Sequence, residues 1–216
     1  MNYFLRAKHW QIFALTYGLP MLLNLFMVPI LFISRHPVIT IELLLSAILS
    51  FGIGGYLAWL WAVAVGLHVK IPVNYRQNLI PFKTSILLIM VYLLAMIRLM
   101  IFICESVKSL LMLLISLIGA IFGGKLDDSL GPDSGFMDIF LRMIIPLQII
   151  SIFCMFYCIY ITAKTFKSAQ LQRSVAFSDF VGEFFLTLFF PVGVWIIQPQ
   201  INKMVKDDSE FKNKQA

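Results

Sequence analysis

Long apolar stretches separated by short polar loops dominate this sequence. Each of the longer stretches can cross a hydrocarbon core of about 30 Å, because a helix rises about 1.5 Å per residue. Lipid cannot hydrogen-bond the backbone, so apolar spans of this length form helices. The pattern predicts an all-α polytopic membrane helix bundle in one domain, residues 1–203, followed by a polar cytoplasmic tail, 204–216. The four predicted transmembrane helices are residues 10–33, 38–66, 85–104 and 137–163.

Two further apolar stretches are too short for a comfortable crossing. Residues 109–122 and 184–197 would each reach only about 21 Å as a helix. Gly123 and Gly124 follow the first stretch, and Pro191 interrupts the second, where it predicts a kink. We expect both to be re-entrant or interfacial segments. The sequence alone leaves open whether they span, re-enter or lie flat.

The distribution of lysine and arginine predicts which side of the membrane each loop occupies. Suppose that the chain has four spans and that residues 184–197 return to the side they came from. Twelve lysine and arginine residues then lie on the same side of the membrane as the termini, and three lie on the other side. If residues 184–197 crossed instead, the bias would disappear. Because cytoplasmic loops are enriched in lysine and arginine, we expect both termini to be cytoplasmic.

Composition strengthens the membrane interpretation. The 216 residues are 60% hydrophobic and 13% charged, whereas soluble domains carry about a quarter charged residues. Mean hydropathy is +0.90. The net charge of +6 comes from basic residues between apolar runs, where they set topology. We therefore expect membrane lipid around the chain and no nucleic-acid partner.

Small residues recur at every fourth position of the second predicted span. Rows of this kind let helix backbones approach closely in lipid. The row serves either a neighbouring helix of the same chain or a homo-oligomer seam, and the sequence does not choose between them. Its members are Ser46, Ser50, Gly54, Ala58, Ala62 and Gly66.

Charged and amide side chains fall in the outer halves of the predicted spans. Such groups usually face the bundle interior and pair, or they mark a pathway. The cluster is interpreted either as an ion-pair network or as a polar cavity that binds an anion or an acidic head group. Its predicted members are Arg98, Arg142, Glu42, Asp138, Asn24 and Gln148.

The sequence carries no motif for catalysis, a metal or a cofactor, so an enzyme is not predicted. Cys154 and Cys158 share one helix face, but Cys104 is expected at a different depth, which argues against copper ligation. No histidine is expected at mid-depth, where a membrane protease would need one. The Gly52-x-Gly54-Gly55 sequence lies inside an apolar helix and follows no strand, so it is not a nucleotide-binding loop.

Three blocks of sequence resemble a widespread group of small bacterial multi-pass membrane proteins of unassigned function. They are residues 66–72 (GLHVKIP), residues 153–167 (FCMFYCIYITAKTFK) and residues 177–203 (FSDFVGEFFLTLFFPVGVWIIQPQINK). The resemblance implies a bacterial inner-membrane location and carries no chemistry. Within the last block, we expect Gln198, Gln200 and Asn202 to hydrogen-bond freed backbone carbonyls or a partner.

Two functional hypotheses follow from these patterns. The first is a non-enzymatic integral membrane scaffold, sensor or accessory subunit of a membrane complex, with homo-oligomerisation or other subunits as partners. The alternative is a small transporter or channel whose outer-half cavity is lined by Arg98, Arg142 and Glu42.

Overall fold

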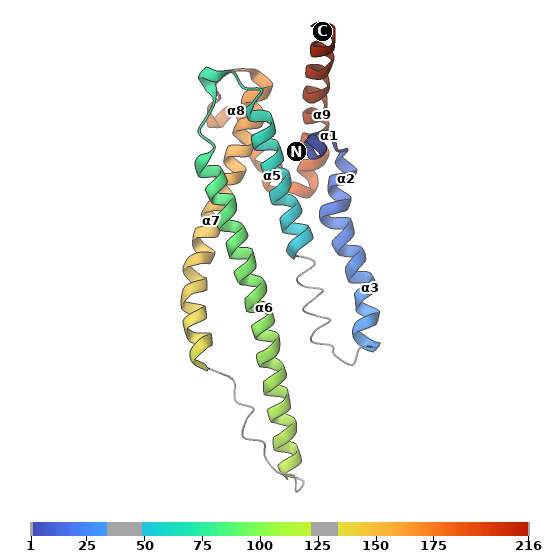
Figure 1. The fold of residues 1–216 in the computed structure, drawn as a ribbon, viewed down its shortest axis with the longest axis vertical. Coiled ribbons are helices and arrows are strands. Elements are labelled where there is room, and N and C mark those ends of the chain that lie inside the picture. Colours follow the sequence, from blue (N-terminus) through green and yellow to red (C-terminus); the bar gives the residue numbers. More distant parts are fainter. Residues whose placement is uncertain (1, 34–48, 122–133, 216) are drawn as a thin grey trace.

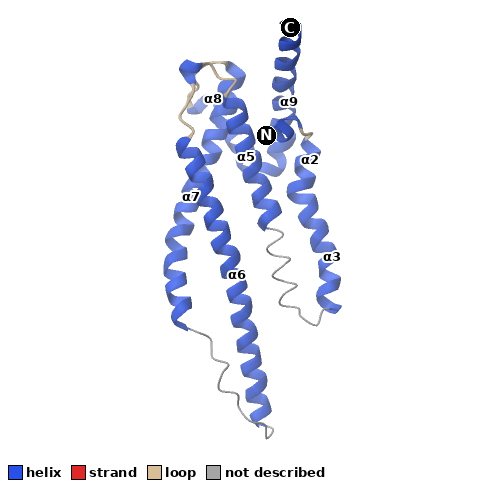
Figure 2. Ribbon diagram, viewed as in Figure 1, coloured by secondary structure: helices blue, strands red, loops and turns tan. Residues whose placement is uncertain are grey.

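The computed structural model describes residues 2–33, 49–121 and 134–215, and every regular element in this part is helical (Figure 2). Its elements are α1 (Asn2–Arg6), α2 (His9–Phe13), η1 (Ala14–Gly18), α3 (Leu19–Ile33), η2 (Leu49–Ile53), α5 (Gly54–His68), η3 (Val73–Tyr75), α6 (Ile80–Ile121), α7 (Ser134–Leu171), α8 (Phe177–Leu188) and α9 (Phe190–Gln215). The predicted all-α class is confirmed.

Within the described residues, three helices are long and apolar enough to cross a membrane: Phe51–His68, Ile80–Leu99 and Arg142–Leu171. They overlap three of the four predicted spans. The first predicted span is helical from His9 to Ile33, but the π-helical turn η1 divides it. This turn ends two residues before Pro20. Proline has no backbone N–H, and its ring clashes with the carbonyl four residues earlier, so a regular α-helical turn is excluded there.

Two helices continue past the predicted ends of their membrane spans. The third span was expected to end at Cys104 before a separate segment at 109–122, but α6 continues without a break to Ile121. The fourth was expected to end at Ala163, yet α7 runs through the predicted basic loop to Leu171. Lysine and glutamine are good helix formers, so a polar surface alone does not end a helix. The predicted re-entrant helix at 109–122 is not confirmed.

The predicted short segment 184–197 consists of the end of α8, a turn at Phe189 and the start of α9. α8 ends at Leu188 and α9 begins at Phe190. Pro191 stands in the first turn of α9, where its missing N–H costs no hydrogen bond. The expected break near Pro191 is therefore present. The polar tail predicted from residue 204 continues α9 to Gln215.

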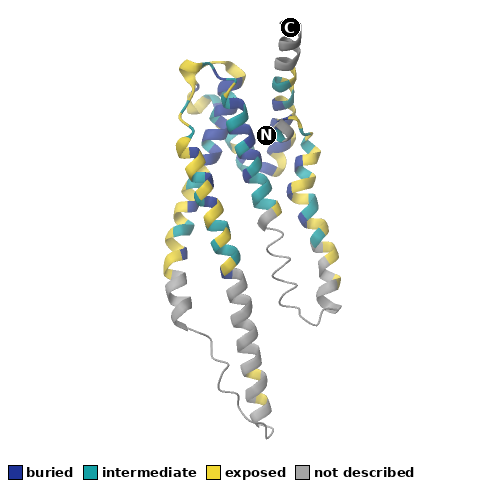
Figure 3. Ribbon diagram, in the orientation of Figure 1, coloured by how far each residue is buried: buried dark blue, intermediate teal, exposed yellow. Residues whose placement is uncertain are grey.

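Both termini and the loops α5–α6 and α7–α8 lie toward one end of the molecule, at the top of Figure 1. α6 and α7 form a long antiparallel pair, and α3 ends and α7 begins toward the opposite end. Buried residues concentrate near the upper end, where α5, α7, α8 and α9 meet (Figure 3). Trp59, Phe82, Phe166 and Phe180 are the largest wholly buried side chains there.

Candidate functional site

One buried glutamine, Gln198, joins α9 to α5 and to the N-terminal segment. Its side chain is 0% exposed. Oε1 accepts a 2.9 Å hydrogen bond from the indole Nε1 of Trp59. Nε2 donates to the carbonyl oxygens of Phe4 at 2.9 Å and Ala7 at 3.1 Å, and it contacts Oδ1 of Asn202 at 3.2 Å. Both ends of the amide are thus used inside the protein.

The break between α1 and α2 explains why an amide is needed there. Lys8 has an extended backbone (φ −72°, ψ 149°), so the last carbonyls of α1 find no donor further along the helix. Gln198 and Nδ2 of Asn202, 3.1 Å from the oxygen of Ala7, supply those donors. These bonds confirm that Gln198 and Asn202 donate hydrogen bonds to freed backbone carbonyls. Gln200 instead accepts from Gln170 at 3.4 Å.

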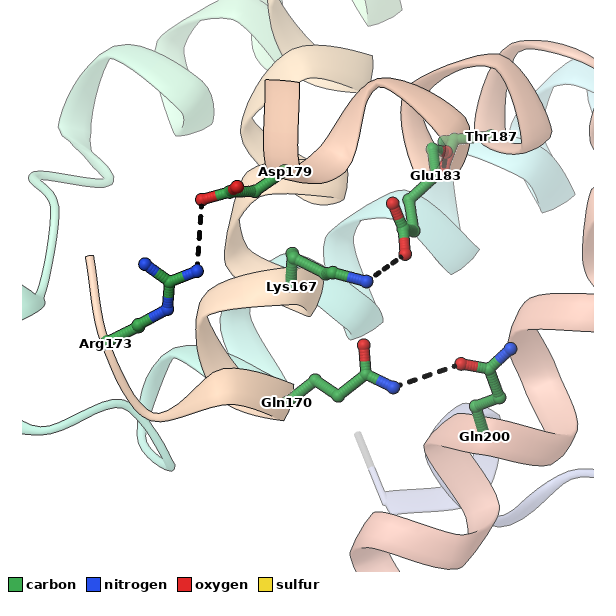
Figure 4. A network of polar contacts seen from close by, with 7 residues as sticks. All are labelled: Lys167, Gln170, Arg173, Asp179, Glu183, Thr187 and Gln200. Atoms are coloured by element: carbon green, nitrogen blue, oxygen red, sulfur yellow. Dashed lines mark hydrogen bonds and ion pairs between the residues drawn. The ribbon is translucent and has the colours of Figure 1, made fainter. Parts of the chain in front are cut away.

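A second polar network joins α7, the following loop, α8 and α9 (Figure 4). Lys167 Nζ lies 2.6 Å from Glu183 Oε1, and the two side chains are 21% and 17% exposed. Arg173 and Asp179 form a looser pair at 3.5 Å, with the arginine 61% exposed. Thr187 Oγ1 donates to the carbonyl of Glu183 at 2.7 Å. The partly buried ion pair therefore sets how α8 lies on α7.

Further hydrogen bonds hold the hairpin of α8 and α9 and the α5–α6 loop in place. The hydroxyl of Tyr56 donates to the carbonyl of Thr187 at 2.9 Å. Lys70 Nζ donates to the carbonyl of Met204 at 2.8 Å. Gln77 Nε2 donates to Thr165 Oγ1 at 2.7 Å. Each bond joins residues far apart in the sequence, so periodicity could not have revealed these pairs.

The predicted row of small residues has different surroundings along its length. A Cβ placed on Gly54 would meet nothing within 4 Å, while one on Gly66 would overlap the side chain of Leu5. Ala62 is buried and Ala58 half-buried. Ser46 lies outside the described residues, and Ser50 lies in η2 with its side chain undescribed.

A second close approach to the N-terminal segment, besides that of Gly66 to Leu5, occurs beside the row. A Cβ on Gly55 would lie 2.7 Å from Cγ2 of Thr16, and one on Gly52 would lie 3.6 Å from the carbonyl oxygen of Thr16. The π-helical turns η1 and η2 contact each other at this point. Glycine is required at position 55 because a buried β-branched side chain already fills the space.

Three members of the predicted polar cluster have described side chains, and they lie on the adjacent helices α6 and α7. Tyr92 on α6 donates a hydrogen bond to Gln148 on α7. Arg98 and Arg142 are exposed on the same two helices. Asn24 lies in α3 and Asp138 in α7 with undescribed side chains, and Glu42 lies outside the described residues.

The described side chains form no group of three or more His, Cys, Asp or Glu residues placed to hold a metal ion. Cys154 is half-buried and Cys158 buried, one helical turn apart on α7. Neither network described above combines a nucleophile with a base. No family model, no curated protein and no solved structure matches this chain.

Proposed function

We propose that this chain is a non-enzymatic integral membrane protein that serves as a scaffold or accessory subunit of a membrane complex in a bacterial inner membrane. The observation that carries the proposal is the length of α6, which runs 42 residues from Ile80 to Ile121. At 1.5 Å per residue this helix is about 63 Å long, roughly twice the hydrocarbon core of a bilayer.

The charge-free part of α7 indicates where the bilayer would lie. No charged residue occurs from Met143 to Ala163, a stretch of about 31 Å between Arg142 and Lys164. α6 pairs with α7 in the antiparallel sense. On α6 the stretch at the same level begins after Lys83 and ends near Glu105, with Arg98 as its one charged residue, so the remainder of the helix would project beyond the lipid.

The projecting part of α6 is apolar, and this supports a protein partner. Leu114 and Ile118, one helical turn apart, are 51% and 48% exposed. Apolar surface outside the bilayer is unfavourable in water and typically marks an interaction site. In the proposed complex another subunit, or a second copy of the chain, covers this face.

The position of the loops supports a topology of four spans with cytoplasmic termini. Both termini and two basic loops lie at one end of the molecule, as the excess of lysine and arginine there requires for a cytoplasmic face. The hairpin of α8 and α9 would dip into the bilayer and return. In its favour, Phe177, Val181, Phe185 and Phe189 follow at four-residue intervals and are all exposed, a face suited to lipid.

Polar substitutions on the projecting face of α6 test whether this face binds a partner. The double variant Leu114→Ser/Ile118→Ser, extracted in mild detergent, should lose the partner or oligomer seen with the wild-type chain by co-purification and light scattering. Val69→Ser/Val73→Ser is the matched control, because these residues are exposed in the loop at the opposite end. A wild-type chain that is a lone monomer in its native membrane would contradict the proposal.

The alternative is a small transporter or channel with Arg98 and Arg142 at its outer mouth. In its favour, both arginines are exposed on adjacent helices, and an arginine in a span is costly unless it reaches water or a partner. Ion flux into proteoliposomes that Arg98→Gln abolishes would support this alternative over the scaffold.

A further inference from the structure

An apolar groove of about 370 Å³ lies between α1, α5 and α6. Its size is within the usual range of ligand sites, about 300–1,000 Å³. Met90 at its rim is 39% exposed, so the groove opens at the surface. The residues that shape it are Phe4, Ala58, Trp61, Ala62, Ile86 and Met90.

The groove lies at the depth of lipid tails in one leaflet. Lys83, which is exposed, stands three residues before Ile86 and seven before Met90, so the three share one face of α6. Ile86 and Met90 lie about 4.5 and 10.5 Å below Lys83 along the helix. Lys83 thus stands at the level of the head groups, and the apolar groove extends from there into the bilayer.

The charges around the groove are of one sign. The segments 2–33 and 49–104, which include α1, α5 and the first part of α6, contain no Asp or Glu, whereas Arg6, Lys8, Lys70, Arg76 and Lys83 lie in or next to these elements. A second copy of the chain that packed through this same face would bring the same cations to the groove, and like charges repel. An anionic lipid supplies the missing negative charge.

We infer that this groove is a binding site for an anionic phospholipid of the leaflet that faces the termini. One acyl chain fills the apolar groove against Trp61, and the head-group phosphate lies at Lys83. The inference rests on the proposed membrane location. It goes beyond that proposal because it assigns a defined lipid site to named residues.

Quenching of tryptophan fluorescence tests the site with the full chain in detergent. Phosphatidylglycerol with brominated acyl chains should quench the emission saturably, and Trp61→Phe should remove that saturable part. Ala58→Leu fills the groove and should raise the half-saturating lipid fraction roughly fifteen- to sixtyfold, since two or three methylenes of the acyl chain would no longer be buried there. Met90→Phe, at the exposed rim, should act in the same direction without a change in the core.

The matched control for filling is Ala14→Leu, the same change at an exposed helical position away from the groove. Lys83→Gln should remove the preference for phosphatidylglycerol over phosphatidylcholine. Lys203 is exposed on α9, so Lys203→Gln should leave the preference unchanged.

Equal quenching of the wild-type chain and of the Ala58→Leu and Met90→Phe variants overturns the inference. So does a dimer that Ala58→Leu dissociates, because a second copy would then occupy the groove. Release of the chain from membranes by alkaline carbonate would instead refute the membrane location.

Discussion

The indole Nε1 of Trp59 donates a 2.9 Å hydrogen bond to Oε1 of Gln198, and both side chains are 0% exposed. The two residues are 139 positions apart. Because Gln198 also serves two carbonyls of the N-terminal segment, this single amide joins three parts of the chain. Removing it leaves a buried donor and buried acceptors without partners.

Gln198→Leu should therefore lower the free energy of unfolding by about 2–4 kcal/mol, since each buried polar group left without a partner costs about 1–3 kcal/mol. Thermal unfolding in detergent, followed by circular dichroism, measures the loss. Gln200→Leu is the control, because Gln200 is exposed and should change stability by less than about 0.5 kcal/mol. Equal stability of the two variants would show that the Gln198 network is not needed for the fold.

Gly193→Ala should destabilise the hairpin of α8 and α9. A Cβ at this position would overlap the carbonyl oxygen of Leu186, which is backbone and cannot move aside alone. We expect a loss of about 1–3 kcal/mol. Gly182→Ala on α8 meets nothing within 4 Å and should stabilise the helix by up to about 1 kcal/mol. Unfolding midpoints of the two variants should move in opposite directions.

Gly54→Leu and Gly55→Leu distinguish packing of α5 against the N-terminal segment from packing of α5 against another copy of the chain. Gly55 faces Thr16, so the leucine should cost about 1–3 kcal/mol of stability. Gly54 faces open space within the chain, so its variant should fold as the wild type does. If light scattering shows that Gly54→Leu turns an oligomer into a folded monomer, the small-residue row is an oligomer seam. An unfolded Gly54→Leu variant would contradict the described packing.

A double-mutant cycle on Lys167 and Glu183 should give a coupling free energy of about 1–2 kcal/mol. The pair is short and mostly buried, and partners in one network couple by about 0.5–3 kcal/mol. The same cycle on Arg173 and Asp179, a looser and more exposed pair, should give less than about 1 kcal/mol. A larger coupling in the exposed pair would reverse the roles assigned to the two contacts.

A reporter fused after Ala216 tests the orientation. We expect the fusion to report a cytoplasmic location, because the basic loops and both termini share one end. An external readout would mean that the hairpin of α8 and α9 crosses the membrane. Substituting Lys203 and Lys206 with glutamine should leave the location unchanged, since the basic stretches 69–79 and 164–176 remain.

The approximate positions of three spans were predictable because lipid requires about twenty consecutive apolar residues in a helix. Residues 51–66, 85–99 and 142–163 are helical in the structure, within their predicted spans. Hydropathy did not predict where α6 and α7 end, because both helices continue past their apolar stretches. α6 passes Glu105 and Lys108, and α7 passes Lys164, because lysine and glutamate are good helix formers and do not end a helix.

The sequence by itself determined the all-helical class and three apolar helices, and it left open whether Gln198, Gln200 and Asn202 bind freed carbonyls or a partner. Only the tertiary structure decided which carbonyls those were, that Trp59 was the third partner, and that Gly55 rather than Gly54 faces Thr16. The physical reason is that periodicity records the solvent preference of each face of a helix. Which residues from distant segments meet is set by how whole helices pack, and no local pattern encodes it.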